Sequence, residues 1–455
     1  MNLSSQRTIP LATWLAAIVA LAGSTAAYVT GNGVILLAFA ILSNLFCLYQ
    51  YSRSQPLLIV TAFMMLNVIY LIPYFWFNIN LAAYQVAVSE YGHTLFLHTL
   101  FLLCLVVFSR KLHPTRRLVD GLTRYNNTFL LIVSLLIMWF IIAFGKTGET
   151  IYQSGGYGST STAGLGGLAL YEYFGIFVIG AFLFSKGSRA AAVVIHISAL
   201  VYCLKSLLLG GRIEVIEVII LLFILYWDQV FPTRIILCFF VIGWILVNLM
   251  GSYRSDPSGF ATDIWPSMVQ AVTGYNPTLH AVVNNQGDVF YSSSAFLYVL
   301  DGGAWSLAYR LGSFATFVAQ IFLPSRYLNS SNILSTGVKQ YLATGGGGLV
   351  DIHFYVWFGY AGLIVAAGII AFVFHKGYSS HLPWVAVYAI LFCAMSPRWF
   401  SYGPTPMVKV CLFGVIYYGL CMLLHRSIAR QQPKPTAALS VRSHRDSIHS
   451  EDAHA

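Results

Sequence analysis

Twelve apolar segments follow one another along this chain, and they constrain its fold more than any other feature. About 17–25 apolar residues are needed to cross a bilayer as a helix. The expected spans are Leu11–Val29, Gly33–Tyr49, Leu57–Phe77, Thr94–Ser109, Thr128–Gly145, Gly166–Phe184, Ala190–Leu209, Ile213–Trp227, Ile235–Met250, Phe354–Phe374, Leu382–Ser396 and Met407–Leu424. Only 9% of the 455 residues are charged, against about 25% in a soluble domain. The sequence therefore predicts an all-α polytopic membrane protein with about twelve transmembrane helices.

Lysine and arginine are distributed unevenly between the connections, which predicts an orientation. Cytoplasmic connections carry an excess of both residues. We therefore expect both termini in the cytoplasm. The first span could also be a signal peptide, but its removal would leave an odd number of spans and place the two termini on opposite sides. The even-numbered connections and the terminal segments hold sixteen of the 25, namely Arg7, Arg53, Arg110, Lys111, Arg116, Arg117, Arg124, Lys186, Arg189, Arg234, Lys376, Arg426, Arg430, Lys434, Arg442 and Arg445.

Two long regions lie outside the expected spans: a loop between spans 9 and 10, and a tail after span 12. Residues 1–424 form the predicted membrane domain, which includes a large periplasmic loop, Gly251–Ile352, between spans 9 and 10. Within this loop, Ser292–Leu300 and Leu311–Leu323 are apolar but too short to cross a bilayer, which favours interfacial or re-entrant helices. Residues 425–455 are rich in Ser, Pro, Arg and His, and they predict a disordered basic cytoplasmic tail.

Five arginines are expected on the outer face, where the charge rule disfavours them. Guanidinium groups bind phosphate and pyrophosphate through paired hydrogen bonds, so this gathering suggests an anion site. The alternative is structural, because these arginines could pair with Glu214, Glu217, Asp256 or Asp301, or extend to the outer head groups. The five are Arg212, Arg254, Arg310, Arg326 and Arg398.

A charged stretch stands at the head of the eighth span, where Gly210-Gly211-Arg212 is followed by Glu214 and Glu217. A charge deep in a bilayer helix costs about 2.5–3.5 kcal/mol on insertion scales, so such groups usually face a cavity or a partner. The two glutamates are three residues apart and share one helical face. They are therefore either partners of Arg212 or, in the case of Glu214, a candidate base.

Candidate general bases also stand before the tenth span. Asp351 and His353 follow the glycine run Gly345–Gly348, which permits close approach to the backbone. A neutral imidazole can take a proton from an attacking hydroxyl. A lone histidine at such a place is also readily explained as a packed boundary residue.

Several chemistries lack their usual motifs. The chain has no His-x-x-x-His, no Asp-x-Asp and no Cys-His cluster, and its seven cysteines are scattered through apolar runs. It has no glycine motif of the nucleotide-binding folds. Membrane topology explains the formal net charge of +10 better than nucleic acid does. We expect no metal, no cofactor and no nucleic-acid partner, and a sugar donor used outside the cytoplasm would have to be lipid-borne.

Three of these features together resemble the Wzy-type polysaccharide repeat-unit polymerases, or O-antigen polymerases. They are Gly-Gly-Arg at the head of a span, a long late outer loop with Phe322–Arg326 and four glycines, and the segment His353–Gly362. In relatives that last segment reads roughly Gly-x-x-x-Glu-x-Tyr-x-x-Phe-Gly-x-x-Gly, and His353 stands where they often have glutamate. The resemblance covers about residues 200–370.

This resemblance implies a metal-independent, GT-C-like glycosyltransferase of the cell inner membrane. It would join undecaprenyl-pyrophosphate-linked oligosaccharides on the periplasmic face, alongside a Wzz-type chain-length regulator, in O-antigen, capsule or exopolysaccharide synthesis. An acceptor hydroxyl attacks the anomeric carbon of the growing chain and releases undecaprenyl pyrophosphate, which requires a base and positive charge. The expected base is His353, Asp351 or Glu214, and the expected pyrophosphate ligands are Arg212, Arg254 and Arg326, followed by Arg310 and Arg398.

Two other functions fit the same composition. An O-antigen ligase uses the same donor, but its usual cue is histidine followed by asparagine, whereas phenylalanine follows His353. A lipid-linked oligosaccharide flippase or a proton-coupled transporter would carry charges at mid-membrane on several helices. Here the charges are expected at the outer ends of the spans, which favours the polymerase.

Overall fold

The computed structural model describes residues 11–81, 85–109, 112, 116–145, 170–209, 211–255, 264–276, 280–282, 284–324 and 327–431. Helices make up most of this part of the chain. The α-helices are α1 (Leu11–Val29), α2 (Gly33–Tyr51), α3 (Gln55–Ile69), α4 (Ile72–Phe77), α5 (Tyr91–Phe108), α6 (Thr128–Phe144), α7 (Phe174–Phe184), α8 (Arg189–Leu208), α9 (Arg212–Leu222), α10 (Thr233–Ser255), α12 (Ile264–Thr273), α13 (Asn285–Asp301), α14 (Leu307–Phe322), α15 (Leu334–Gly337), α16 (Val350–Phe358), α17 (Tyr360–Ser379), α18 (Pro383–Ala394), α19 (Ser396–Tyr402) and α20 (Thr405–Gln431).

Shorter elements connect these helices. Strands β1 (Tyr275–Asn276) and β2 (Ala281–Val282) form an antiparallel pair in which Tyr275 lies opposite Val282. The backbone N–H of Val282 also donates to the carbonyl of Asn80 at 2.7 Å, which ties the long loop to the end of α4. The remaining turns are η1 (Val86–Glu90), η3 (Leu118–Gly121), η5 (Leu170–Tyr173), the π-helical η6 (Phe223–Trp227), η8 (Ser330–Asn332) and η9 (Val338–Gln340).

Within the described residues, six helical stretches are long and apolar enough to cross a membrane, which supports an all-α membrane protein. They are Gly33–Tyr51, Gln55–Phe77, Val86–Phe108, Arg189–Leu208, Tyr360–Ser379 and Thr405–Arg430. Five further apolar helices are shorter than this. Each of the twelve expected spans overlaps a helix, but the number twelve itself stays a prediction.

Three expected segments have wrong boundaries, and one of them is the third span, which is divided between α3 and α4 at Tyr70 and Leu71. The tenth span does not run unbroken through Phe354–Phe374, because Gly359, at φ 63°, ends α16 and starts α17. Only glycine adopts such a conformation without strain. The expected tail is also helical over its first residues, since α20 continues to Gln431. Basic side chains such as Arg430 are favourable at a helix C-terminus. Residues 432–455, the rest of that tail, lie outside the described residues.

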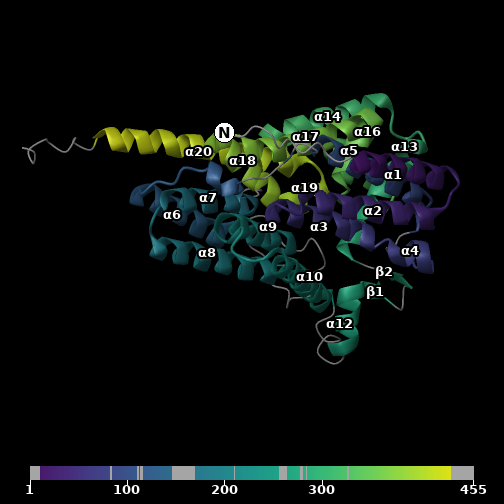
Figure 1. Cartoon of the computed structure of the whole chain (residues 1–455), viewed down its shortest axis with the longest axis horizontal. Helices are drawn as coiled ribbons and strands as arrows, with labels where there is room; N and C mark the ends of the chain where they lie inside the picture. The colour runs from purple at the N-terminus through teal and green to yellow at the C-terminus, as the bar shows by residue number, and fades with distance from the viewer. Residues whose placement is uncertain are drawn as a thin grey trace, which may run out of the picture.

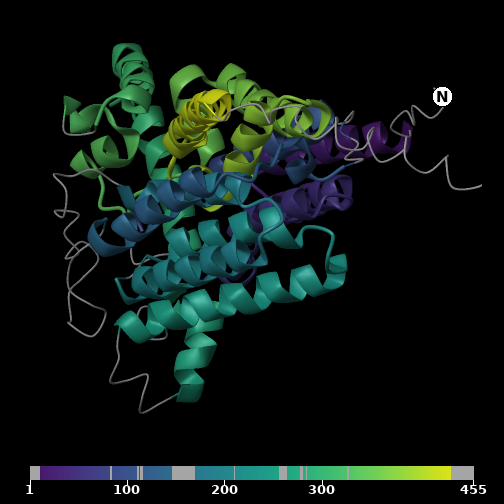
Figure 2. The same ribbon diagram turned by 90° about the vertical axis from the view of Figure 1, so that its left-hand side faces the viewer.

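The helices form two groups around central buried members. Most of them run along the longest dimension of the molecule, and α12 projects from the body beside α10 (Figures 1 and 2). One group packs α1, α2, α3, α13, α16 and α17 around or beside α5, and the other combines α6, α7, α8, α9, α18 and α20. Helix α5 buries residues on all its faces, among them the consecutive Leu95, Phe96 and Leu97, as expected of a helix that is apolar all round.

The even-numbered connections gather at one end of the helical body. Side-chain hydrogen bonds join segments far apart in the chain at this end. They run from Gln55 Nε2 to the Phe231 carbonyl at 2.6 Å, from Arg116 Nε to the Tyr378 carbonyl at 2.7 Å, and between Asn127 Nδ2 and His425 Nδ1 at 3.0 Å. The long loop is not a separate lobe in its described part, because α13 packs on α5 and α16, and α14 packs on α16 and α20.

Candidate functional site

Helix α19 lies where the two groups of helices meet. It contacts α9, α18 and α20 on one side and α3, α13 and α16 on the other. The indole of Trp399, fully buried, donates to the Phe392 carbonyl at 2.7 Å and so fixes the helix on α18. This short helix therefore positions its remaining side chains against both groups.

Arg398 on α19 binds three carboxylates from two other segments. Its Nη2 lies 3.0 Å from Glu214 Oε1, its Nε lies 3.4 Å from Glu217 Oε1, and its Nη1 contacts Glu172 Oε1. The glutamates at 214 and 217 occupy successive turns of one face of α9, as their spacing predicts, and Glu172 stands in η5 just before α7. We call these four residues the Arg398 cluster.

The Arg398 cluster is withdrawn from water and rich in negative charge. Only 16% of the Arg398 side chain and 6% of the Glu217 side chain are exposed. Three carboxylates around one guanidinium leave formal negative charge if all are ionised. Such a group does not attract pyrophosphate through Arg398, so the observed geometry is the structural pairing that the sequence left open for this arginine.

A second buried pair joins α5 to α16. The Nδ1–H of His98 donates to Asp351 Oδ2 at 2.8 Å, and both side chains are fully buried. Their other polar atoms, His98 Nε2 and Asp351 Oδ1, have no hydrogen-bond partner in the part of the chain that the structure describes. The imidazole rests edge-on against Phe400 of α19, with ring centroids 5.8 Å apart. Asp351 is thus a partner of His98 rather than a group open to a substrate.

The glycine run (residues 345–348) packs closely against its neighbours. Gly346, Gly347 and Gly348 have φ of 93°, 90° and 144°, which side chains rarely allow. A Cβ on Gly347 would lie 2.8 Å from the Ser401 carbonyl, and that carbonyl accepts the Gly348 N–H at 2.9 Å. These contacts explain why the sequence uses glycine here: the run has to pass close to the backbone of α19.

His353 stands at one end of the glycine run. Its Nδ1–H donates to the Leu349 carbonyl at 3.0 Å, which leaves Nε2 as an acceptor. A Cβ on Gly403 would lie 3.0 Å from that Nε2. Burial lowers the pKa of His353 to about 4, so the imidazole is neutral at pH 7. The imidazole can therefore accept a proton, but it is a weaker base than an exposed histidine.

Asp288 of α13 stands at the other end of the run. A Cβ on Gly345 would lie 3.2 Å from Asp288 Oδ2. Burial raises the pKa of Asp288 to about 6. A carboxyl that titrates near neutrality suits proton transfer. We call Asp288, the glycine run, His353 and Gly403 the glycine-run site.

Of the other arginines expected on the outer face, the structure describes the side chains of Arg310 and Arg212. Arg310 on α14 directs its Nε to the Val356 carbonyl and its Nη2 to the Trp357 carbonyl at 3.5 Å, so it caps the C-terminal end of α16. Arg212 is half-buried at the first position of α9. The side chain of Arg254 and the whole of Arg326 lie outside the described residues.

Three residues are close enough together to hold a metal ion. Glu90, His93 and Asp301 offer ligand atoms that all lie within 4.8 Å of one another. His93 Nδ1 lies 3.2 Å from Asp301 Oδ2 and 3.5 Å from Glu90 Oε2. One imidazole nitrogen facing two carboxylates is also the geometry of a protonated histidine in an ion pair, so this group does not by itself indicate a metal.

No family model, curated protein or solved structure matches this chain.

Three residues of these groups, Glu172, His98 and Asp288, are not among the residues predicted from the sequence. Glu172 lies within the expected span Gly166–Phe184 and His98 within Thr94–Ser109. An ionisable residue inside a span indicates a buried partner or a functional site, so both could have been found. Asp288 has no such signal. It is one acidic residue in a long loop, and only the contact with Gly345 distinguishes it.

Proposed function

We propose that this protein is a repeat-unit polymerase, a glycosyltransferase that joins undecaprenyl-pyrophosphate-linked oligosaccharides on the periplasmic face of the inner membrane. The observation that carries the proposal is the glycine-run site. A stretch of backbone without side chains runs between a carboxyl whose pKa is about 6 and a neutral imidazole. Gly345 is exposed, so a sugar hydroxyl can approach Asp288 at this end of the run. Gly347 and Gly348, in contrast, are packed against α19 and Phe296 beside His353.

The reaction assigns a role to each end of this site. The acceptor hydroxyl gives its proton to Asp288 or His353 while its oxygen attacks the anomeric carbon of the growing chain. The bond from that carbon to the pyrophosphate oxygen breaks, and undecaprenyl pyrophosphate leaves with the electron pair. Lys339, whose Nζ would be 3.5 Å from a Cβ on Gly346, supplies positive charge beside the run. Arg212, Arg254 and Arg326 remain the proposed pyrophosphate ligands.

The other charged groups then act by positioning. The Arg398 cluster fixes α9 to α19, and the His98–Asp351 pair fixes α5 to α16. Each holds one of the helices on which the glycine-run site is built. A Wzz-type chain-length regulator would set the length of the product and is part of the proposal.

Deletion in the native host tests the function. Surface polysaccharide resolved on a gel should show lipid A-core carrying a single repeat unit when the product is O-antigen, since ligation continues without polymerisation. Complementation with the wild-type chain should restore the ladder. Loss of the single-unit band as well as the ladder would contradict a polymerase and point to a flippase or a ligase.

Matched variants test the site within the same assay. His353→Gln and Asp288→Asn should each reduce long chains while the amount of membrane protein is unchanged. His196→Gln is the control for the histidine, because His196 Nδ1 also bonds the carbonyl four residues earlier, at 2.7 Å. Asp301→Asn is the control for the carboxyl, at the opposite end of α13. If both site variants give the wild-type ladder, the assignment of the base is wrong.

A proton-coupled transporter is the second candidate, and one observation favours it. The Arg398 cluster and the His98–Asp351 pair place ionisable groups from η5, α5, α9, α16 and α19 in the interior. Buried charges on several helices are typical of proton relays. The same gel separates the two functions, since loss of a flippase leaves lipid A-core without any repeat unit.

A further inference from the structure

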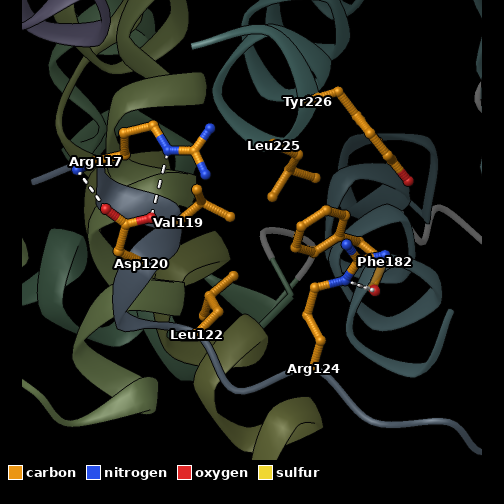
Figure 3. Close-up of a pocket in the computed structure, with 8 residues that line it drawn as sticks. All are labelled: Arg117, Val119, Asp120, Leu122, Arg124, Phe182, Leu225 and Tyr226. Atoms are coloured by element: carbon orange, nitrogen blue, oxygen red, sulfur yellow. Dashed lines mark hydrogen bonds and ion pairs between the residues drawn. The ribbon is translucent and has the colours of Figure 1, made fainter. Parts of the chain in front are cut away.

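A pocket lies at the end of the body where the even-numbered connections gather. Its volume is about 380 Å³, and it is formed by the segment around η3, the end of α7 and the π-helical turn η6. Figure 3 shows Arg117 and Arg124 on opposite sides of the view, with apolar side chains such as Leu225 and Phe182 between them. The pocket is distant in the fold from α19 and takes no part in the proposed reaction.

The two arginines are held in place by hydrogen bonds that do not use all of their guanidinium N–H donors. Arg117 Nε donates to Asp120 Oδ1 at 3.3 Å and its Nη1 to the Asp228 carbonyl at 3.5 Å. Arg124 bonds the Phe182 carbonyl through Nε and Ser185 through Nη2. Within the described ranges, Nη2 of Arg117 and Nη1 of Arg124 make no protein hydrogen bond. Each guanidinium is therefore fixed and can still donate to a ligand.

The residues that line the pocket carry two positive charges and one negative charge, and the carboxyl of Asp228 lies near Arg117 outside the lining. Asp120 is its one acidic lining residue, and both of its oxygens accept from Arg117, through Nε and through the backbone N–H at 2.9 Å. Arg124 has no carboxylate partner among the described residues, and its guanidinium lies 4.3 Å from the centre of the Phe182 ring. The charge of Arg124 is therefore available to an anion.

An unpartnered hydroxyl adds a second polar contact. Tyr226 lines the pocket, and its Oη is buried without a protein hydrogen bond of ordinary geometry in the described part of the chain. It stands in the π-helical turn η6, and such turns are frequent at functional sites because they displace side chains from the regular helical path. The Ser185 hydroxyl stands near the Tyr226 hydroxyl but donates to the Phe182 carbonyl, so a ligand oxygen can complete the hydrogen bonding of Tyr226.

We propose that this pocket binds the phosphodiester head group of an anionic membrane phospholipid. The polar groups suit phosphate oxygens, and Val119, Leu122 and Leu225 suit the apolar region next to the head group. Basic pockets between membrane helices on the cytoplasmic side are typical sites for anionic head groups. In the proposed topology this is the cytoplasmic end.

Native mass spectrometry of the full chain tests the proposal. The protein in detergent is offered equal amounts of dioleoyl phosphatidylglycerol and dioleoyl phosphatidylcholine, and the wild type should retain phosphatidylglycerol in preference. Arg117→Gln and Arg124→Gln should each weaken that binding at least about tenfold. One positive charge near a membrane surface is worth about 1 kcal/mol, or about fivefold in affinity. Arg189→Gln, an exposed arginine at the same end, is the control and should lose no more than this.

A third variant keeps the test decisive if an arginine variant fails to fold. Leu122→Trp fills the pocket without changing charge, and it should also abolish the preference while the melting midpoint in lipid-free detergent is retained. Equal losses in the pocket variants and in Arg189→Gln would show general surface attraction and overturn the proposal. The last experiment adds inorganic phosphate as a competitor of the lipid. If it displaces phosphatidylglycerol from the wild type at millimolar concentration, the ligand is a free phosphate and the lipid assignment is wrong.

Discussion

The residue that departs most from the expectation is Arg398. The sequence places it among five arginines for one anion, and the structure gives it three carboxylates. Burying a guanidinium is costly unless its hydrogen bonds are satisfied. Removing one partner of a buried pair leaves the other charge buried without compensation. Removal of the single positive charge should therefore destabilise the protein strongly, and removal of one negative charge should destabilise it little.

This asymmetry gives a prediction. Arg398→Gln should lower the free energy of unfolding by about 3–5 kcal/mol, because three carboxylates lose their partner. Glu172→Gln should change it by less than about 1 kcal/mol, since this glutamate is the most exposed of the three and its loss relieves repulsion. Thermal unfolding in detergent, followed by tryptophan fluorescence, measures both, with Arg189→Gln as the surface control. A larger loss for Glu172→Gln than for Arg398→Gln would contradict this account.

At the scale of elements, the arrangement of α16 and α19 decides what the glycine-run site can do. The two helices meet through glycines: Gly348 donates to the Ser401 carbonyl, and Gly403, at φ 109°, brings the backbone beside His353. The break at Gly359 ends α16 after nine residues. The His353 side chain therefore belongs to a short helix that is separate from α17 but packs against it.

A glycine substitution tests this arrangement. Gly403→Ala adds a Cβ 3.0 Å from His353 Nε2 and requires an alanine at φ 109° and ψ 163°, a conformation nearly restricted to glycine that costs about 1–3 kcal/mol. We expect fewer long chains at unchanged protein level. Gly312→Ala in α14 is the matched control, because no atom lies within 4 Å of its Cβ, and alanine should stabilise the helix by about 0.5–1 kcal/mol. Equal activity of the two variants would show that this contact is unimportant.

At the scale of the whole molecule, the two ends of the helical body differ in charge and in construction. One end carries the basic connections and the arginine-lined pocket of Figure 3, and the other carries η5, the head of α9 and the acidic groups that meet Arg398. The positive-inside rule then predicts which end faces the cytoplasm.

Cysteine labelling checks this orientation. In a background without the seven native cysteines, Ala304→Cys after α13 should react with a membrane-impermeant thiol reagent in intact spheroplasts. Lys186→Cys, between α7 and α8, should react only after permeabilisation. Both positions are exposed, so access depends on the side of the membrane. The reverse pattern would invert the topology and exclude a periplasmic reaction at the glycine-run site.

The sequence by itself indicated a helix in each expected span and the segregation of basic connections. These properties are local: hydropathy decides which segments leave water, and residues such as Asn127 and Ser188 begin helices through their own side chains. Glu214 and Glu217 share a face because they are three residues apart.

Only the tertiary structure decided which groups meet. Arg398 pairs with Glu214, which is 184 residues away in the chain, and Asp351 pairs with His98, which is 253 residues away. An apolar helix is satisfied by lipid or by any apolar neighbour, so hydropathy does not specify which helices pack together. The buried polar groups do specify it, because each needs a particular partner. That requirement becomes visible only when helices distant in the chain lie side by side.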